Sequence, residues 1–375
     1  TNLQGVARQR LGRLLTNGVV DVSFDSGISI STDLVVLALA YQDGKVFASS
    51  GNFGDASLGC FLQRLNPDGQ LDSTFAQTNI IQDWTVFGLT PRTNGSILVY
   101  GGFQHINGIN RAGLALVSTN GELDATFTSP LETDTNALSY STVFSVIVLP
   151  DNSVLIGGRF WRQGSTNRSA VAKLSPTLVW DDSFQPDDFG PLLSPTSPYG
   201  VVMSAIPQSD GKFIFGGLFQ EVGGYWRRNI VRLDAQGHVD PCFDPGLGRG
   251  DHGYIGACAL AQQSDGRIIA GGNFVTQLGN PVVSESSSNL TRFLPQSDCG
   301  VTRVYLGKDG LGQNFVAATC APGGTNHLQL STNLVDWTTI DPFPSNPPTS
   351  PYVYFDQLNI PVLDGGLFFR VKKEY

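Results

Sequence analysis

The chain repeats one pattern of residues five times. Each copy has an apolar run, a polar turn of the Asp-Gly type and a second apolar run that ends at or near a phenylalanine. Residues 39–53 read LAYQDGKVFASSGNF and residues 206–219 read IPQSDGKFIFGGLF. Similarity of this length in tandem indicates supersecondary modules, each of which buries its apolar faces only against its neighbours.

Each copy is predicted to open with a β-hairpin, because its polar turn lies between runs rich in β-branched and aromatic residues. The turns fall at Asp43 and Gly44, Asn94 and Gly95, Asp151 and Asn152, Asp210 and Gly211, and Asp265 and Gly266. A third strand follows at residues 111–117, 168–174, 228–233 and 289–294, and residues 11–15 look like a further example. Paired glycines at the end of four hairpins predict a close backbone approach to a neighbouring module.

An Asp-x-x-Phe sequence, here called the closure, ends each copy. The closures pair Asp21 with Phe24, Asp72 with Phe75, Asp124 with Phe127, Asp181 with Phe184, and Asp240 with Phe243. The aspartates resemble a ring of carboxylates, but none of the closures has the several acidic oxygens of a calcium loop. We expect a structural role, in which each Asp accepts backbone N–H bonds in an Asx-turn and each Phe fills the gap between modules.

Three or four short strands per module in tandem predict an all-β protein with a β-propeller of five blades, or alternatively six. The first closure precedes the first hairpin and the last hairpin lacks one. We therefore predict that the N-terminal segment completes the last blade and closes the ring.

These residues resemble the delta-sixty repeat β-propeller family of exported bacterial proteins. The resemblance rests on motifs such as the Gly-Gly-x-Phe run at residues 216–219 and the closure at residues 240–243, and it extends over roughly residues 11 to 295. It implies a propeller and brings no catalytic residues. Asn152 replaces the turn glycine of the third copy, and Leu116 stands where other copies have Arg64, Lys173 or Arg232.

The C-terminal stretch has a different composition. A Ser-Thr-Asn-Leu-x-x-Trp run ends at Trp337, and a Phe-Phe-Arg-Val strand follows at residues 368–371. These are similar to a small β-sandwich module at the C-termini of exported proteins of planctomycete and verrucomicrobial type. We therefore predict a propeller over residues 1–298 and a β-sandwich over residues 299–375.

Charge and hydropathy exclude several classes of partner. The 23 basic and 32 acidic residues give a net charge of −9, which argues against nucleic acid and anionic membrane surfaces. No apolar run approaches the roughly 20 residues of a membrane span. Because the chain begins at Thr1, we expect that a secretory signal has been removed and that the protein is secreted or lies on the cell surface.

The five cysteines contain no Cys-x-x-Cys pair, which disfavours structural zinc. Cys242 with Cys258 and Cys299 with Cys320 are candidate disulfides, and the alternative is buried free thiols. Cys60 is then left over.

Motifs that carry chemistry are missing from the sequence. The four histidines stand apart, so we predict neither a metal nor another cofactor. A Ser-x-x-Lys string at residues 209–212 belongs to a hairpin turn, and the Gly-x-Gly-x-x-Gly string at residues 248–253 has no strand before it.

Aromatic residues in the loops after the hairpins are the remaining binding candidates. Trp161, Tyr225, Trp226 and Arg228 are suited to stacking on sugar rings and to hydrogen bonding, and the alternative is packing between blades.

The sequence therefore predicts a non-catalytic extracellular protein that associates with protein partners or with itself. The alternatives are a glycan- or ligand-binding module and an enzyme that acts at the propeller channel, the latter by analogy with other propellers alone.

Overall fold

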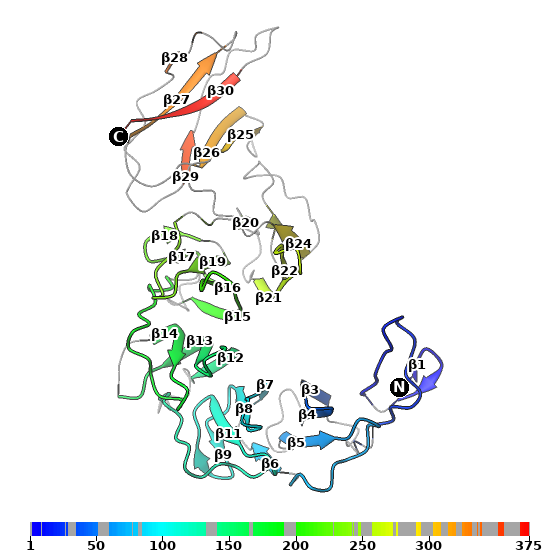
Figure 1. Ribbon diagram of the computed structural model, residues 1–375. Helices are drawn as coiled ribbons and strands as arrows, with labels where there is room; N and C mark the ends of the chain where they lie inside the picture. The colour runs from blue at the N-terminus through cyan, green and yellow to red at the C-terminus, as the bar shows by residue number, and fades with distance from the viewer. Residues whose placement is uncertain are drawn as a thin grey trace. The chain divides into compact units, whose positions relative to one another are not determined.

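A computed structural model shows that all the regular secondary structure in the described residues is β-strand (Figure 1). It describes residues 2–8, 10–26, 28, 35–51, 60–76, 78–81, 85–132, 141–164, 168–190, 200–227, 229–241, 243, 247–248, 257–272, 275–276, 290–293, 303–308, 314–319, 325–331, 336, 338–339, 352–355 and 368–374. The chain divides into two compact units, Thr1–Ser183 and Phe184–Tyr375.

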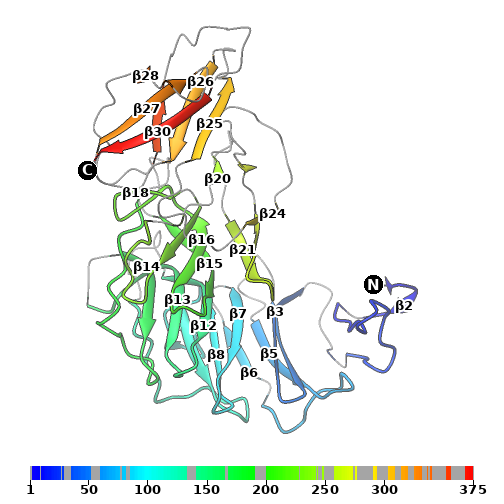
Figure 2. The same cartoon turned by 45° about the horizontal axis from the view of Figure 1, so that its top comes forward.

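The first unit contains three complete copies of the repeat, each an antiparallel sheet in which the third strand pairs with the second. Their strands are β3 (Val35–Gln42), β4 (Lys45–Gly51) and β5 (Cys60–Leu65); β7 (Val86–Pro91), β8 (Ile97–Gly101) and β11 (Leu114–Val117); and β12 (Thr142–Val148), β13 (Val154–Trp161) and β14 (Arg168–Leu174). Figure 2 shows β7, β8, β12 and β13 side by side, and these strands are in contact.

Short strands accompany these sheets in the first unit. They are β1 (Asn2–Leu3), β2 (Val6–Ala7), β6 (Thr78–Ile81), β9 (His105–Ile106) and β10 (Ile109–Asn110). The pairs β1–β2 and β9–β10 are small hairpins, and β9–β10 lies just before the third strand of the second copy.

The second unit contains two further copies of the same sheet. Their strands are β15 (Val201–Pro207), β16 (Phe213–Leu218) and β19 (Ile230–Leu233), and β21 (Ala257–Gln262), β22 (Ile268–Gly272) and β24 (Leu290–Phe293). The short strands of this unit are β17 (Glu221–Val222), β18 (Tyr225–Trp226), β20 (Leu247–Gly248) and β23 (Val275–Thr276).

The C-terminal strands form two three-stranded antiparallel sheets, ordered β25-β26-β29 and β28-β27-β30. They are β25 (Arg303–Lys308), β26 (Asn314–Thr319), β27 (Thr325–Ser331), β28 (Thr338–Thr339), β29 (Tyr352–Phe355) and β30 (Phe368–Glu374). The sandwich packing of these sheets and the domain boundary at residue 298 stay predictions.

Turn chemistry differs among the copies. Both residues of the Asp43 and Gly44 turn have positive φ, of 49° and 78°, as a two-residue hairpin requires. The other hairpin turns are longer, and the positive φ falls on a glycine in three of them and on Asn152, at 64°, in the third copy. Asparagine tolerates this left-handed conformation, which explains why the copy folds without a glycine there.

The paired glycines do bring two stretches of backbone together, but within one module. A Cβ on Gly217 would lie 2.0 Å from the carbonyl oxygen of Val201, on the first strand of the same hairpin. Gly158 has the same relation to Thr142 at 2.1 Å. The expected close approach to a neighbouring module is therefore wrong for these glycines. At the register shift of the hairpin, the backbone of its own first strand lies where a side chain would be.

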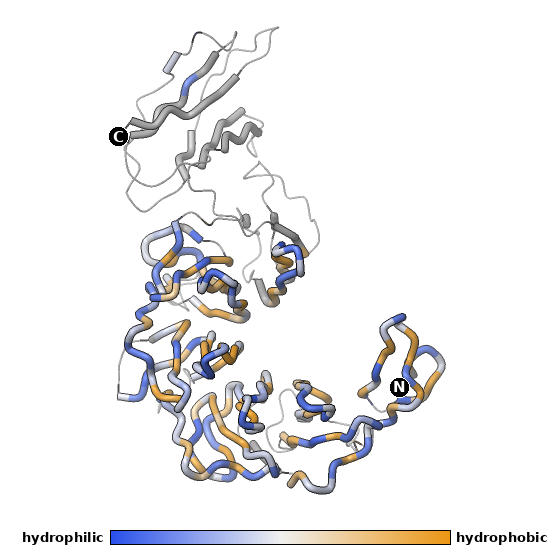
Figure 3. The backbone as a smooth tube through the Cα atoms, viewed as in Figure 1, coloured by the Kyte–Doolittle hydropathy of each residue, from blue (hydrophilic) through white to orange (hydrophobic). Residues whose placement is uncertain are grey.

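Hydrophobic residues concentrate in the strands and hydrophilic ones in the turns (Figure 3). Separate clusters of buried residues span consecutive copies. One joins Phe47 and Leu62 of the first copy to Val86 and Ile97 of the second, and another joins Leu98 of the second to Ile156 of the third. The first and second copies therefore each complete their core with residues of the next one, as tandem modules do.

Candidate functional site

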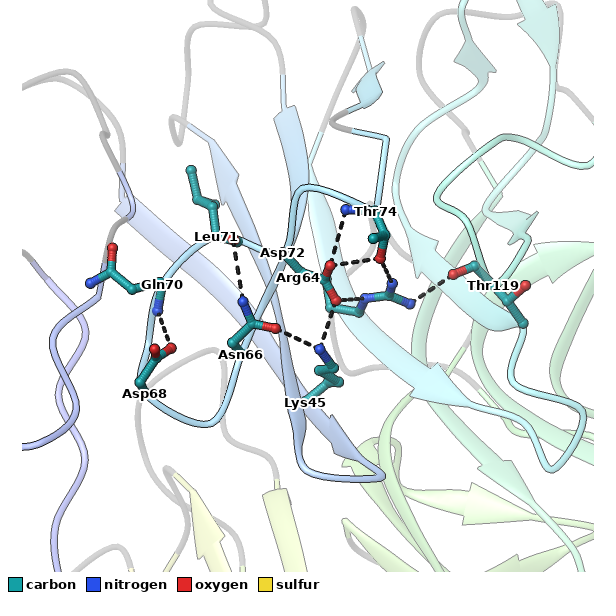
Figure 4. Close-up of polar contacts among 9 residues, drawn as sticks. All are labelled: Lys45, Arg64, Asn66, Asp68, Gln70, Leu71, Asp72, Thr74 and Thr119. Atoms are coloured by element: carbon teal, nitrogen blue, oxygen red, sulfur yellow. Dashed lines mark hydrogen bonds and ion pairs between the residues drawn. The ribbon is translucent and has the colours of Figure 1, made fainter.

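The closures are the most elaborate polar sites in the described residues, and Asp72 shows their geometry (Figure 4). Its Oδ1 accepts hydrogen bonds from the backbone N–H of Thr74 at 3.0 Å and from the Thr74 hydroxyl at 2.6 Å. Its Oδ2 lies 2.9 Å from Nε of Arg64 and 2.9 Å from Nζ of Lys45. The carboxylate thus forms an Asx-turn and an ion pair with two cations.

The same arrangement recurs at equivalent positions. Asp21, Asp124 and Asp181 each accept from the backbone N–H and hydroxyl of the residue two positions on. In all five closures the backbone N–H of the aspartate also donates to the backbone carbonyl eight residues earlier, at 2.8 to 2.9 Å. Asp240 contacts Lys212 at 2.7 Å and Arg232 at 2.9 Å.

The third-strand arginine also links consecutive copies. Nη1 of Arg64 donates to the carbonyl of Thr119 in the turn of the next copy, at 2.7 Å, and Arg13 donates to Pro67 in the same way. In the second copy Leu116 replaces this arginine. There Nη2 of Arg92, from the hairpin turn, donates to the carbonyl of Pro176 in the next copy at 2.6 Å. A cation from another strand therefore compensates for the departure from the repeat pattern.

These contacts fix the protonation state of the closures. Hydrogen bonds from Thr74 and Lys45, together with the nearby Arg64, hold the pKa of Asp72 far below its ordinary value. The pKa values of Asp21, Asp124 and Asp181 are also lowered, in each case mainly by the hydroxyl two residues on. The carboxylates of these four closures are therefore anions with their oxygens engaged in structural contacts.

We expect the stability of the protein to fall in acid. A carboxylate whose pKa is lower in the folded state stabilises the fold above its unfolded pKa of about 3.9, and this contribution is lost as the pH falls through the folded value. The melting temperature should therefore be nearly constant between about pH 7 and 5 and should fall below about pH 4. Asp72→Asn should lessen the shift, and a melting temperature that rises in acid would contradict the assignment.

The closure phenylalanines lie between copies. Phe75 is 3% exposed, and its ring packs edge-on against Phe47 with centroids 5.7 Å apart, while Arg64 lies 4.8 Å above it. Phe24, Phe127 and Phe243 are likewise buried in clusters with neighbouring strands. Phe184 packs edge-on against Phe213, at 6.2 Å.

Trp161 ends β13 as a half-buried residue, with Arg162 exposed beside it. Arg162 lies 5.2 Å from the ring of Trp180 and forms an ion pair with Asp182. Trp180 was not among the predicted site residues. The signal was present in the sequence, because Trp180 takes the place of Leu71, Leu123 and Val239 in the other closures.

Tyr225 lies in β18, and the guanidinium of Arg227 lies 5.2 Å from its ring. Arg227 is fully buried, so the ring of Tyr225 makes a cation–π contact with a buried guanidinium. Trp161 directly follows Phe160, whereas Tyr225 lies six residues after Phe219; the two aromatic residues therefore occupy different positions of the repeat. The side chain of Trp226 and all of Arg228 lie outside the described residues.

Cys60 is a buried cysteine on β5, and burial raises the pKa of its thiol. The disulfide candidates Cys242, Cys299 and Cys320, and the side chain of Cys258, lie outside the described residues. Within the described part, no three His, Cys, Asp or Glu side chains are grouped so as to hold a metal ion. The described residues contain no helix that is long and apolar enough to cross a bilayer.

A family model described as a domain of unknown function (DUF5122) β-propeller matches the chain five times. The matches cover residues 42–75, 92–127, 149–184, 208–243 and 263–295, and the first four each run from a hairpin to its closure phenylalanine. Residues 42–295 belong to this β-propeller repeat family. The predicted propeller class and the propeller-repeat resemblance are thereby confirmed, while ring closure by the N-terminal segment stays a prediction.

Solved structures similar to this β-propeller chain share little sequence with it. PorZ, a bacterial surface component of the type-IX secretion system of Porphyromonas gingivalis, is 12% identical with a TM-score of 0.43, over 90% of this chain and 43% of PorZ. An endo-1,4-β-xylanase from Bacteroides thetaiotaomicron is 13% identical with a TM-score of 0.35, over 77% of this chain and 96% of the enzyme. The chain thus spans less than half of PorZ. No curated protein matches the chain in sequence.

Proposed function

We propose that the chain is a non-catalytic structural or assembly protein of the cell exterior, whose propeller repeats associate with other proteins or with further copies of the chain. The observation that carries this proposal is an exposed apolar strip on β3. Leu39 and Tyr41, which both follow the bulge of this strand, are 51% and 71% exposed and lie on the same face. Apolar residues that are contiguous and ordered at a surface mark sites of protein contact.

The charged groups of the repeats support a non-catalytic role. A general acid needs a carboxyl whose pKa is raised toward neutrality, and the closure aspartates are shifted in the opposite direction. Their partners, such as Arg64 and Arg232, form ion pairs with the closure aspartates of their own copies.

The bulge on the first strand of each hairpin also presents apolar residues. In the described side chains these are Leu37, Phe87, Phe144 and Met203, and the rings of Phe87 and Phe144 lie 4.9 Å apart. Such residues suit packing rather than proton transfer.

Concentration-dependent mass measurements and negative-stain microscopy test the proposal. The wild-type chain should form assemblies, and a Leu39→Ser and Tyr41→Ser double variant should weaken association by at least about tenfold, since it removes two exposed apolar side chains. Val179→Ser, at a residue 57% exposed elsewhere in the same unit, serves as the matched control. Monodisperse single particles at every concentration, alone and with extracts of the source cell surface, would contradict the proposal.

Glycan binding is the second candidate function, favoured by the half-buried Trp161 beside the exposed Arg162. An aromatic ring next to a hydrogen-bond donor is the usual means of stacking on a sugar. Trp161→Ala should then abolish a glycan-array signal, with Tyr41→Ala as a control. An array without signal would remove this candidate.

A further inference from the structure

Residues 2–24 are the second half of a repeat. The β1–β2 hairpin corresponds to β9–β10 and to β17–β18. The arginine after each hairpin is buried, and its Nη2 donates to a backbone carbonyl in its closure: Arg8 to Asp21, at 3.1 Å, Arg111 to Asp124, at 3.2 Å, and Arg227 to Pro241, at 3.0 Å. The segment therefore has a small hairpin, a stretch at the third-strand position that bridges to the closure through Leu14, and a closure.

What this segment lacks is visible at Leu14. In the complete copies, the third-strand residue that bridges to the closure is Leu65, Val117, Leu174 or Leu233, and all four are 0% exposed. Leu14 makes the same bridge, to Val20, yet is 52% exposed. The same position of the repeat is thus fully buried in the four complete copies and exposed to solvent in the N-terminal segment.

The difference arises from the second strand of the hairpin. In each complete copy, a residue of this second strand lies opposite the bridging residue of the third strand and covers it. These pairs are Val46 with Leu65, Ile97 with Val117, Val154 with Leu174 and Phe213 with Leu233. In the described part of the chain, no strand pairs with the corresponding edge of residues 11–15. Each of the five described hairpins already pairs with its own third strand, so none of them is left over for Leu14.

Charge indicates the same missing element. Asp72 and Asp240 each receive two cations, and one of them is the hairpin lysine that follows the Asp-Gly turn, Lys45 or Lys212. Asp21, which is also buried, has Arg13 at 2.8 Å, and among the described side chains no hairpin lysine pairs with it. Leu15, Val19 and Val22 add apolar surface around this position, at 48%, 51% and 72% exposed. Leu15 takes the place of the polar Asn66, Ser118, Ser175 and Asp234 at the start of the same turn.

We propose that residues 11–22 are an acceptor site for one β-hairpin of the repeat's own type, contributed by polypeptide outside these 375 residues. Its second strand pairs antiparallel with residues 11–15 and places an apolar residue over Leu14. A cation after its turn joins Arg13 at the carboxylate of Asp21. The four complete copies define this occupant, because each shows such a hairpin seated on the equivalent residues. The inference does not depend on the proposed function, since it follows from comparing the chain with itself.

A fusion tests the site with the whole chain. Residues 200–219, which contain the β15–β16 hairpin and Lys212, are copied in front of Thr1. Because Asn2 corresponds to Glu221, this restores the spacing of a complete repeat. In the chain alone, Leu14→Ala should lower the folding equilibrium constant by no more than about threefold, because the side chain is exposed. In the fusion it should lower that constant by at least about 30-fold, as for a buried leucine.

Amide exchange supplies a readout that does not depend on global unfolding. The backbone amides of residues 13–15 should be protected in the fusion, and also when the hairpin is added as a separate peptide. The matched control is the same fusion with Phe213→Asp in the copied hairpin, which places a charge opposite Leu14 and should abolish the protection.

Two outcomes would overturn the proposal. One is an unchanged cost of Leu14→Ala in the fusion, with no added protection at residues 13–15. The other is a dimer of the unfused chain that Leu14→Asp abolishes, which would assign the site to a second copy. Association through β3 is distinguishable, because it responds to Leu39→Ser and Tyr41→Ser and not to Leu14→Asp.

Discussion

Phe75→Ala should destabilise the first unit by about 3 to 5 kcal/mol, among the largest effects of a single substitution in this chain. The ring is 3% exposed and is shared by two copies of the repeat, with Phe47 on one side and Val86 and Ile97 in the same cluster on the other. Its removal leaves a cavity and also ends the edge-on contact with Phe47 and the contact with Arg64. Urea denaturation followed by circular dichroism measures the loss.

The matched control for this substitution is Tyr41→Ala. It removes an aromatic ring from the same unit, but one that is 71% exposed, so the midpoint of unfolding should move little. Hydrogen exchange should show the Phe75→Ala defect first in β4, β5 and β8, whose residues meet at the closure. Equal effects of the two substitutions would mean that Phe75 does not join the copies.

Asp240→Asn should cost about 3 to 5 kcal/mol in the second unit, because it leaves a buried cation without its anion. Asp240 and Arg232 are 7% and 3% exposed in their side chains, and Nη2 of Arg232 lies 2.9 Å from Oδ2 of Asp240. An asparagine keeps the shape and one acceptor oxygen but removes the charge. Faster hydrogen exchange in β16 and β19, together with a lower denaturation midpoint, is the expected result.

The second copy supplies the control for this prediction. Asp124 faces Leu116 where Asp240 faces Arg232, and it is less buried. Asp124→Asn retains the acceptor for Thr126 and should therefore cost less than about 1 kcal/mol. If both substitutions cost the same, the cations do not contribute to the closures.

The positions of the loop aromatic residues in the repeat could not be predicted from the sequence. Trp161, Tyr225 and Trp226 were predicted to lie in the loops after their hairpins, but Trp161 directly follows Phe160 whereas Tyr225 lies six residues after Phe219. Pairing in the structure places Trp161 at the end of β13 and Tyr225 in the separate β18. Trp180 escaped notice because its partner, Arg162, lies 18 residues before it, and a cation over a ring leaves no local pattern.

The amino-acid sequence by itself determined the repeat, the all-β class and the positions of the five repeat hairpin turns and of the closures. It did so because period, turn residues and β-branched runs are local properties of the chain. Only the tertiary structure decided which cations pair with the closure carboxylates and that Arg92 replaces the arginine missing at Leu116. It also decided that Leu14 is exposed where Leu65 and Leu233 are buried. These depend on strands brought together from distant parts of the chain, and the residues involved carry no mark of their partners in their own surroundings.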